Sequence, residues 1–348
     1  MMKKIIGIAL FAVALVACKK ENTKTVTKVN PETGKTETLT VEVPEEEKIK
    51  AAIVDSAGIF KQKFYLEKGV TYPLIAYQRD IQNVSTPDGK SVSGTSESTD
   101  EMSVTVNDFK DNVYDLSVNL IAKRNSTSAN GKTVVSDTKA AAPKEEQLKG
   151  MYTINKAITG NKLTMKMNVD GKILSVTGFD PIYTKIGSAL GTLVKDAKQR
   201  GEIVSNFKRG FNEATIKEQF EKNLKIFPAK GVKIGEKWTV TEDVIPGADL
   251  KLTSNYVLTK VENGKAEISV NGSIPTKSDK QSKDGITHSM SLGGSQNGKI
   301  ILDSNTGWIL HENISIKTNQ KETISDGTKS QSMTQNSTSS IIMNPSYK

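Results

Sequence analysis

Apolar and polar residues alternate through most of the chain after about Gly58, which is the pattern of half-buried β-strands. Residues 70–76, 102–106 and 114–120 each place an apolar side chain at every second position. The alternation returns at Val232 and continues to about Met343. The sequence therefore predicts two β regions, at 58–179 and 228–348.

Between these regions the apolar residues recur at the spacing of a helix. Asp180 is predicted to cap a first helix, which Gly201 ends. A second helix is predicted to start after Asn212 and to end before Pro228. The pattern predicts a mainly β (α+β) fold, with a curved antiparallel sheet or two related β halves and a helical middle at 180–227.

The two β regions open alike, because a glycine precedes an aromatic strand residue in each. Gly69 stands three residues before Tyr72, and Gly235 stands three residues before Trp238. We interpret this as an internal duplication. Three segments rich in Ser, Thr, Gly, Lys and Asp, at 83–100, 124–150 and 273–298, are predicted to interrupt the sheet as mobile hairpin tips.

The N-terminus predicts a signal peptide at 1–17, with a basic start and an apolar run too short to span a bilayer. Its last residues, Leu15, Val16 and Ala17, together with Cys18 resemble a bacterial lipobox. That resemblance implies cleavage after Ala17 and a diacylglyceryl group on the Cys18 thiol, which gives a membrane anchor. Cys18 is the only cysteine, so no disulfide can form within the chain.

Residues 18–57 are predicted to be a flexible tether that follows the lipidated cysteine. Lys, Thr and Glu dominate the segment, and 45–47 is a run of three glutamates. Leu39, Val41 and Val43 alternate, which permits a small hairpin within the tether. The domain organisation is therefore a signal peptide, a tether and one β-rich region at 58–348.

Loss of Lys3 and Lys4 with the signal peptide lowers the formal charge from +9 to +7. The excess is almost all lysine, and Arg79, Arg124, Arg200 and Arg209 are the only arginines. Proteins that bind nucleic acid use the planar guanidinium group of arginine to contact bases and phosphates, so nucleic acid is not expected as a partner. Dispersed lysines are typical of a soluble β surface, and weak attraction to anionic lipid or an envelope polymer is the alternative.

No constellation of residues predicts catalysis, a metal site or a cofactor. His288 and His311 are the only histidines, and no Gly-x-Ser-x-Gly turn is present. The glycine-rich run 293–299 enters a predicted strand, where no helix N-terminus faces a phosphate. The acidic pairs Asp100-Glu101 and Glu242-Asp243 leave one alternative open, a carboxylate-based hydrolase of cell-wall or surface glycan.

The lipobox, the opening of the strand at Tyr72 and the segment Val232 to Trp238 resemble a family of Bacteroidetes lipoproteins, domain of unknown function 6263. The resemblance covers the chain from about Gly58 and implies a mostly antiparallel β domain in the cell envelope. In that phylum, the residues around Ser56 also resemble a short O-glycosylation motif. No aspartate follows Cys18, which favours the outer membrane, and the single acidic residue nearby favours the periplasmic face.

Taken together, these patterns predict a lipid-anchored, non-enzymatic envelope lipoprotein whose β-rich domain has a binding or structural role. One form of the binding role is an apolar ligand held between the sheet and the helices, and the alternative is a dry core filled by side chains. Met151, Met165 and Met167 are the candidate lining residues, since methionine adapts to irregular ligands.

Overall fold

The computed structural model describes residues 23–29, 36–42, 51–244 and 250–347. The chain divides into two compact units, Met1–Lys50 and Ala51–Lys348. In the first unit, β1 (Thr23–Val29) and β2 (Thr36–Glu42) form an antiparallel hairpin inside the predicted tether. Cys18, the predicted lipobox and the predicted signal peptide lie outside the described residues.

The second unit is built on one large antiparallel sheet, and β8 (Lys132–Asp137) pairs with β7 beside its main path. The end strands β10 and β11 do not pair with each other, so the described sheet is not closed. In spatial order the remaining strands are β10 (Ile173–Thr177), β9 (Lys162–Asn168), β7 (Val113–Ala129), β6 (Ser91–Lys110), β5 (Thr71–Ser85), β16 (Ser330–Met343), β15 (Ile309–Ser325), β14 (Ile286–Asp303), β13 (Lys265–Lys283), β12 (Lys251–Glu262) and β11 (Lys237–Asp243).

The pairing of β5 with β16 joins the strands of the two predicted β regions into this single sheet. A short hairpin of β3 (Ile53–Ser56) and β4 (Ile59–Gln62) lies outside the sheet and reaches Val232 through a backbone bridge at Phe60. Since Ile53 and Ala52 are buried, the compact unit includes residues 51–57, which the sequence pattern had assigned to the tether.

One face of the sheet carries the core. Directly opposed residues share a face, and Leu258, Ile268 and Ile300 are opposed across three strands and fully buried. Val104 and Val118 do the same in the other half of the sheet, and all five belong to one apolar cluster. The apolar residues at alternate positions of these strands therefore lie on the buried face, as the alternation in the sequence predicts.

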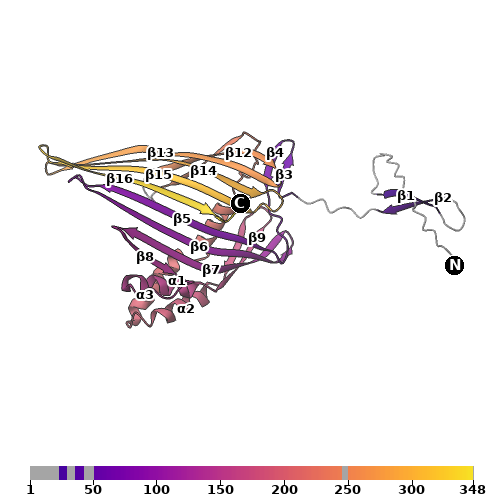
Figure 1. Ribbon diagram of the computed structural model, residues 1–348, viewed down its shortest axis with the longest axis horizontal. Coiled ribbons are helices and arrows are strands. Elements are labelled where there is room, and N and C mark those ends of the chain that lie inside the picture. Colours follow the sequence, from indigo (N-terminus) through magenta and orange to yellow (C-terminus); the bar gives the residue numbers. More distant parts are fainter. Residues whose placement is uncertain (1–22, 30–35, 43–50, 245–249, 348) are drawn as a thin grey trace, which may run out of the picture. The chain divides into compact units, whose positions relative to one another are not determined.

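Four described helices, α1 (Glu146–Ile158), α2 (Phe179–Leu190), α3 (Ala197–Gly210) and α4 (Glu213–Leu224), complete the unit. α1 contacts β7 and β8, α2 packs on α1, and α3 packs on α2 (Figure 1). α4 contacts β10 and buries Ile216, Phe220 and Leu224.

The predicted first helix is wrong in its limits, because the chain breaks it into α2 and α3. The cap of α2 is Gly178, in a left-handed conformation, and Asp180 lies in the first turn. Asp196 restarts the helix as α3 by accepting a hydrogen bond from the amide of Gln199 at 2.7 Å. Gly201, predicted as the stop, lies inside α3. Asn212 does cap the next helix, as predicted.

The three polar segments do not interrupt the sheet. Residues 83–100 belong to β5, its turn and β6, and residues 273–298 belong to β13 and β14. Residues 124–150 contain the end of β7, β8 and the start of α1. These strands extend beyond the core, and the last nine residues of β13 are exposed on both faces. A strand that is polar on both faces has no period of two in its hydrophobicity, so the pattern hid it.

Candidate functional site

An apolar pocket lies where the turn between β14 and β15 meets the first residues of β5 and the C-terminal segment. Its volume is about 300 Å³. Aromatic and aliphatic side chains form most of its wall, and we call it the Trp308 pocket. It is lined by Tyr72, Pro73, Ile75, Asp303, Thr306, Trp308, Ile309, Leu310, Asn344, Ser346 and Tyr347.

The turn from Asp303 to Trp308 positions the tryptophan. The amide of Asp303 donates to the carbonyl of Trp308 at 2.9 Å, and the Asp303 Oδ1 accepts from the amide of Asn305 at 2.7 Å. Trp308 Nε1 donates to the carbonyl of Pro73 at 2.9 Å, so the indole is attached to β5. The rings of Trp308 and Tyr72 lie 5.3 Å apart. Burial raises the pKa of the Tyr72 phenol, which therefore stays neutral at physiological pH.

Asn344 holds the C-terminal segment against β5 and β15. Its Oδ1 accepts from the amide of Ile75 at 2.9 Å, and its Nδ2 donates to the carbonyl of Ile309 at 2.9 Å. Its backbone has a φ of +48°, which turns the chain toward the pocket. Tyr347 follows, stacked on His311 with ring centroids 6.3 Å apart. The last residues of the chain thus form part of the pocket wall.

Such a pocket can hold a small apolar or amphiphilic group. Ligand sites are mostly apolar, with a few polar groups that orient the ligand. Here the polar groups are Asp303, Thr306 and Asn344. Within the described residues, the Asp303 carboxylate accepts only backbone amides and forms no ion pair.

The three methionines expected to line a ligand cleft lie in two different environments. Met165 and Met167 are almost completely buried in the core cluster, where they fill space. Met151 lies on α1 and is 38 % exposed. None of the three lines the Trp308 pocket. No pattern in the sequence indicates this pocket, because its aromatic rings come from positions as distant as Tyr72 and Tyr347.

Ser56 ends β3 and is exposed in the turn before β4, a position open to modification. The amide of Gly58 donates to Asp55 Oδ1 at 2.7 Å across this turn. His288 and His311 lie on different strands, β14 and β15, and no cluster of metal-ligating side chains occurs among residues 51–244 and 250–347.

The acidic pairs considered for a hydrolase are engaged with lysines. Asp100 pairs with Lys123, and Glu101 pairs with Lys139 at 2.6 Å. Glu242 pairs with Lys222 at 2.6 Å, and Asp243 pairs with Lys251 at 3.4 Å. Each of these carboxylates therefore has a local structural partner. No helix in the described part of the chain is long and apolar enough to cross a membrane.

Comparisons with known proteins give one family. A model described as a family of unknown function (DUF6263) matches residues 111–309. No curated protein matches. A solved structure titled as lipid–protein interactions in lipovitellin aligns with 80 % of this chain at 9 % identity and a TM-score of 0.36, and the match spans only 25 % of that chain. An outer membrane channel from Pseudomonas putida F1 aligns with 83 % of this chain and 99 % of its own, at 9 % identity and a TM-score of 0.17. These identities and scores are too low to assign a shared fold.

Proposed function

The chain belongs to the DUF6263 family of unknown function, and from this premise we propose that it is a lipid-anchored, non-catalytic protein of the cell envelope that binds a small apolar ligand. The observation that supports binding is the Trp308 pocket, with its apolar wall, its few polar groups and a volume of about 300 Å³. The lysine partners of the four acidic residues support a role without catalysis.

The anchor in this proposal is a lipid on Cys18 that holds the protein in the outer membrane, with the β-rich domain on the periplasmic side. It is supported by the residues Leu15 to Cys18 and by the position of the only cysteine. A single acyl chain binds a membrane only marginally, so stable attachment takes more than one chain.

A Cys18→Ser chain is expected to leave the membrane fraction and to take up no label from palmitate, since it lacks the acceptor thiol. The measurement is fractionation of cells after metabolic labelling. Ser56→Ala is the matched control, and it should stay with the membrane because it leaves the lipobox intact. A Cys18→Ser chain that still sediments with membranes after a high-salt wash, which removes binding through surface charge, contradicts the anchor.

Binding of 1-decanol, an uncharged amphiphile, is expected to change the emission of Trp308. A Trp238→Phe background leaves Trp308 as the sole tryptophan, because the chain has two. Adding Leu310→Phe fills part of the pocket and should weaken binding about tenfold, equivalent to 1.4 kcal/mol. Leu193→Phe is the control, at a side chain 42 % exposed and outside the pocket. Absence of any decanol response, with no lipid bound in native mass spectrometry, would refute the ligand.

A further inference from the structure

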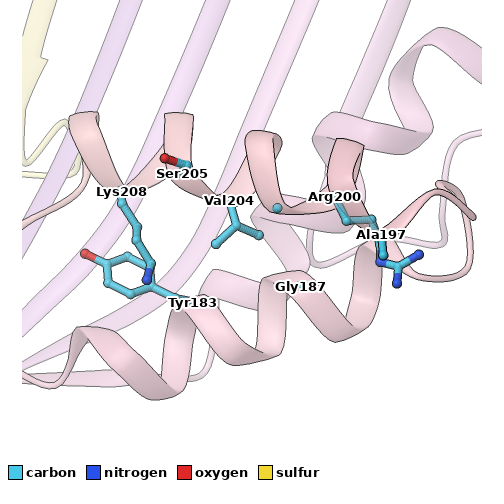
Figure 2. A pocket seen from close by; sticks show the side chains of 8 residues that line it. Tyr183, Gly187, Ala197, Arg200, Val204, Ser205 and Lys208 are labelled. Carbon is cyan, nitrogen blue, oxygen red and sulfur yellow. The ribbon is translucent and has the colours of Figure 1, made fainter.

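A second cavity, between α2 and α3, has the features of an anion site. Its volume is about 510 Å³, and Tyr183 and Gly187 of α2 face Arg200, Gly201, Val204 and Lys208 of α3 across it. We call it the α2–α3 hollow. Figure 2 shows Lys208 and Val204 projecting from α3 toward α2, while Arg200 extends toward the loop that joins the two helices.

Two glycines open the hollow where the backbone does not require glycine. A Cβ on Gly201 would meet no atom within 4 Å, and one on Gly187 would make an ordinary contact with Val204 at 3.7 Å. Neither residue has a left-handed φ. Glycine is the least favourable residue in a helix interior apart from proline. We therefore attribute the two glycines to the cavity, which side chains at these positions would fill.

The two cations of the hollow are oriented without being neutralised. Arg200 Nη1 donates to the carbonyl of Val194 at 2.8 Å and to the carbonyl of Lys195 at 2.7 Å. The Lys208 ammonium lies 4.7 Å from the centre of the Tyr183 ring. Neither cation forms an ion pair with a carboxylate in the described part of the chain.

The surrounding surface adds positive charge. Between positions 179 and 210, α2, α3 and the loop that joins them contain six cations and three acids, and one of the acids, Asp196, caps α3. No ion pair in the described residues involves any of the six. They are Lys185, Lys195, Lys198, Arg200, Lys208 and Arg209.

We propose that the α2–α3 hollow binds phosphate groups, one near Arg200 and one near Lys208. The two residues are eight positions apart on one helix, a rise of about 12 Å, so a single small anion does not bridge them. Guanidinium and ammonium groups are the usual protein partners of phosphate oxygens. The phosphates come either from neighbouring anionic lipid headgroups or from a soluble polyphosphorylated molecule. This inference does not depend on the Cys18 anchor or on the Trp308 pocket.

The test uses the full chain with Cys18→Ser, so that membrane binding cannot come from a lipid on that residue. One arm measures sedimentation with phosphatidylcholine vesicles, with and without phosphatidylglycerol. The other arm measures calorimetric binding of inorganic tripolyphosphate. Arg200→Gln with Lys208→Gln should weaken binding by about tenfold or more, since two charged contacts are lost. Lys198→Gln with Arg209→Gln removes the same charge outside the hollow and should change binding less than about twofold.

Gly201→Leu gives an independent variant, because it keeps every charge, favours the helix and fills the hollow. It should weaken binding as strongly as the Arg200 and Lys208 pair. Binding only to phosphatidylglycerol vesicles supports lipid headgroups as the source, and binding only to tripolyphosphate supports a soluble source. The proposal is overturned if neither probe binds, if both double variants lose binding equally, or if Gly201→Leu binds normally.

Discussion

Replacing Gly307 with alanine is expected to destabilise the folded chain by about 3 kcal/mol or more, through backbone strain and overpacking together. Gly307 has a φ of +75°, and a Cβ at this position would lie 2.0 Å from the carbonyl oxygen of Lys63. The two segments cannot separate freely, because the amide of Tyr65 donates to Thr306 at 3.1 Å and Gln62 donates to the Gly307 carbonyl at 3.0 Å. The same turn positions Trp308, so the variant should also lose the pocket.

Gly285→Ala is the matched control, because Gly285 has a φ of +78° and a Cβ there would meet nothing within 4 Å. It isolates the left-handed conformation and should cost about 1 kcal/mol. Urea unfolding of the two variants and the parent chain measures the difference. If the two substitutions destabilise equally, the close approach of Lys63 to Gly307 is wrong.

The antiparallel, mainly β fold could be predicted because a strand with one buried face alternates apolar and polar residues, and this alternation is visible in a short stretch of sequence. Tyr114, Leu116 and Val118 alternate with polar residues, and their side chains are buried on one face. Alternation fails as a signal in the strand extensions beyond the core. There Ser282 and Thr287 share a hydrogen bond at 2.9 Å across the hairpin, and backbone pairing is independent of hydrophobicity.

The opening glycines of the two β regions do adopt matching conformations. Gly69 and Gly235 have φ values of +83° and +82°. Each donates its amide to a neighbouring strand, Gly69 to Val106 at 2.8 Å and Gly235 to Leu258 at 2.8 Å. The duplication itself stays a prediction, as does the curvature of the sheet.

Both cavities depend on how distant segments are placed next to each other in the fold, which the pattern of a single sequence does not show. The Trp308 pocket needs the pairing of β5 with β16, which brings Tyr72 next to the C-terminal segment. The α2–α3 hollow needs the break after Leu190, beyond which Asp196 caps α3. The helical pattern ran through that break because apolar residues continued on the same spacing. Met165 and Met167 were predicted to contact a ligand, but both side chains are buried in the core cluster.

The second large effect is expected at Glu312, whose carboxylate lies on the core face. It stands directly opposite Ile300 of β14 and Met343 of β16, both buried. No described residue gives it a hydrogen bond or an ion pair. Burial raises the pKa of Glu312 to about 7. The folded chain therefore holds a proton on this residue at pH values where the unfolded chain has released it.

Stability should consequently fall as the pH rises. For an acid with a raised pKa the folded state binds more protons, so the free energy of unfolding decreases with pH between the two pKa values. The decrease should begin near the ordinary value of 4.5, be complete just above 7 and then level off. Glu312→Gln cannot ionise, so it should match the parent chain at pH 4 and exceed its stability by about 3 kcal/mol at pH 8.

Chemical unfolding across this pH range, with Glu218→Gln as the control, measures the effect. Glu218 is exposed on α4, so its substitution removes the same charge without changing the core face. Parallel pH profiles for Glu312→Gln and the parent chain would mean that water reaches the carboxylate in the folded state. If the free energy of unfolding falls between pH 4.5 and 7 in the parent chain and in Glu218→Gln, but not in Glu312→Gln, ionisation of Glu312 is the cause of the loss of stability.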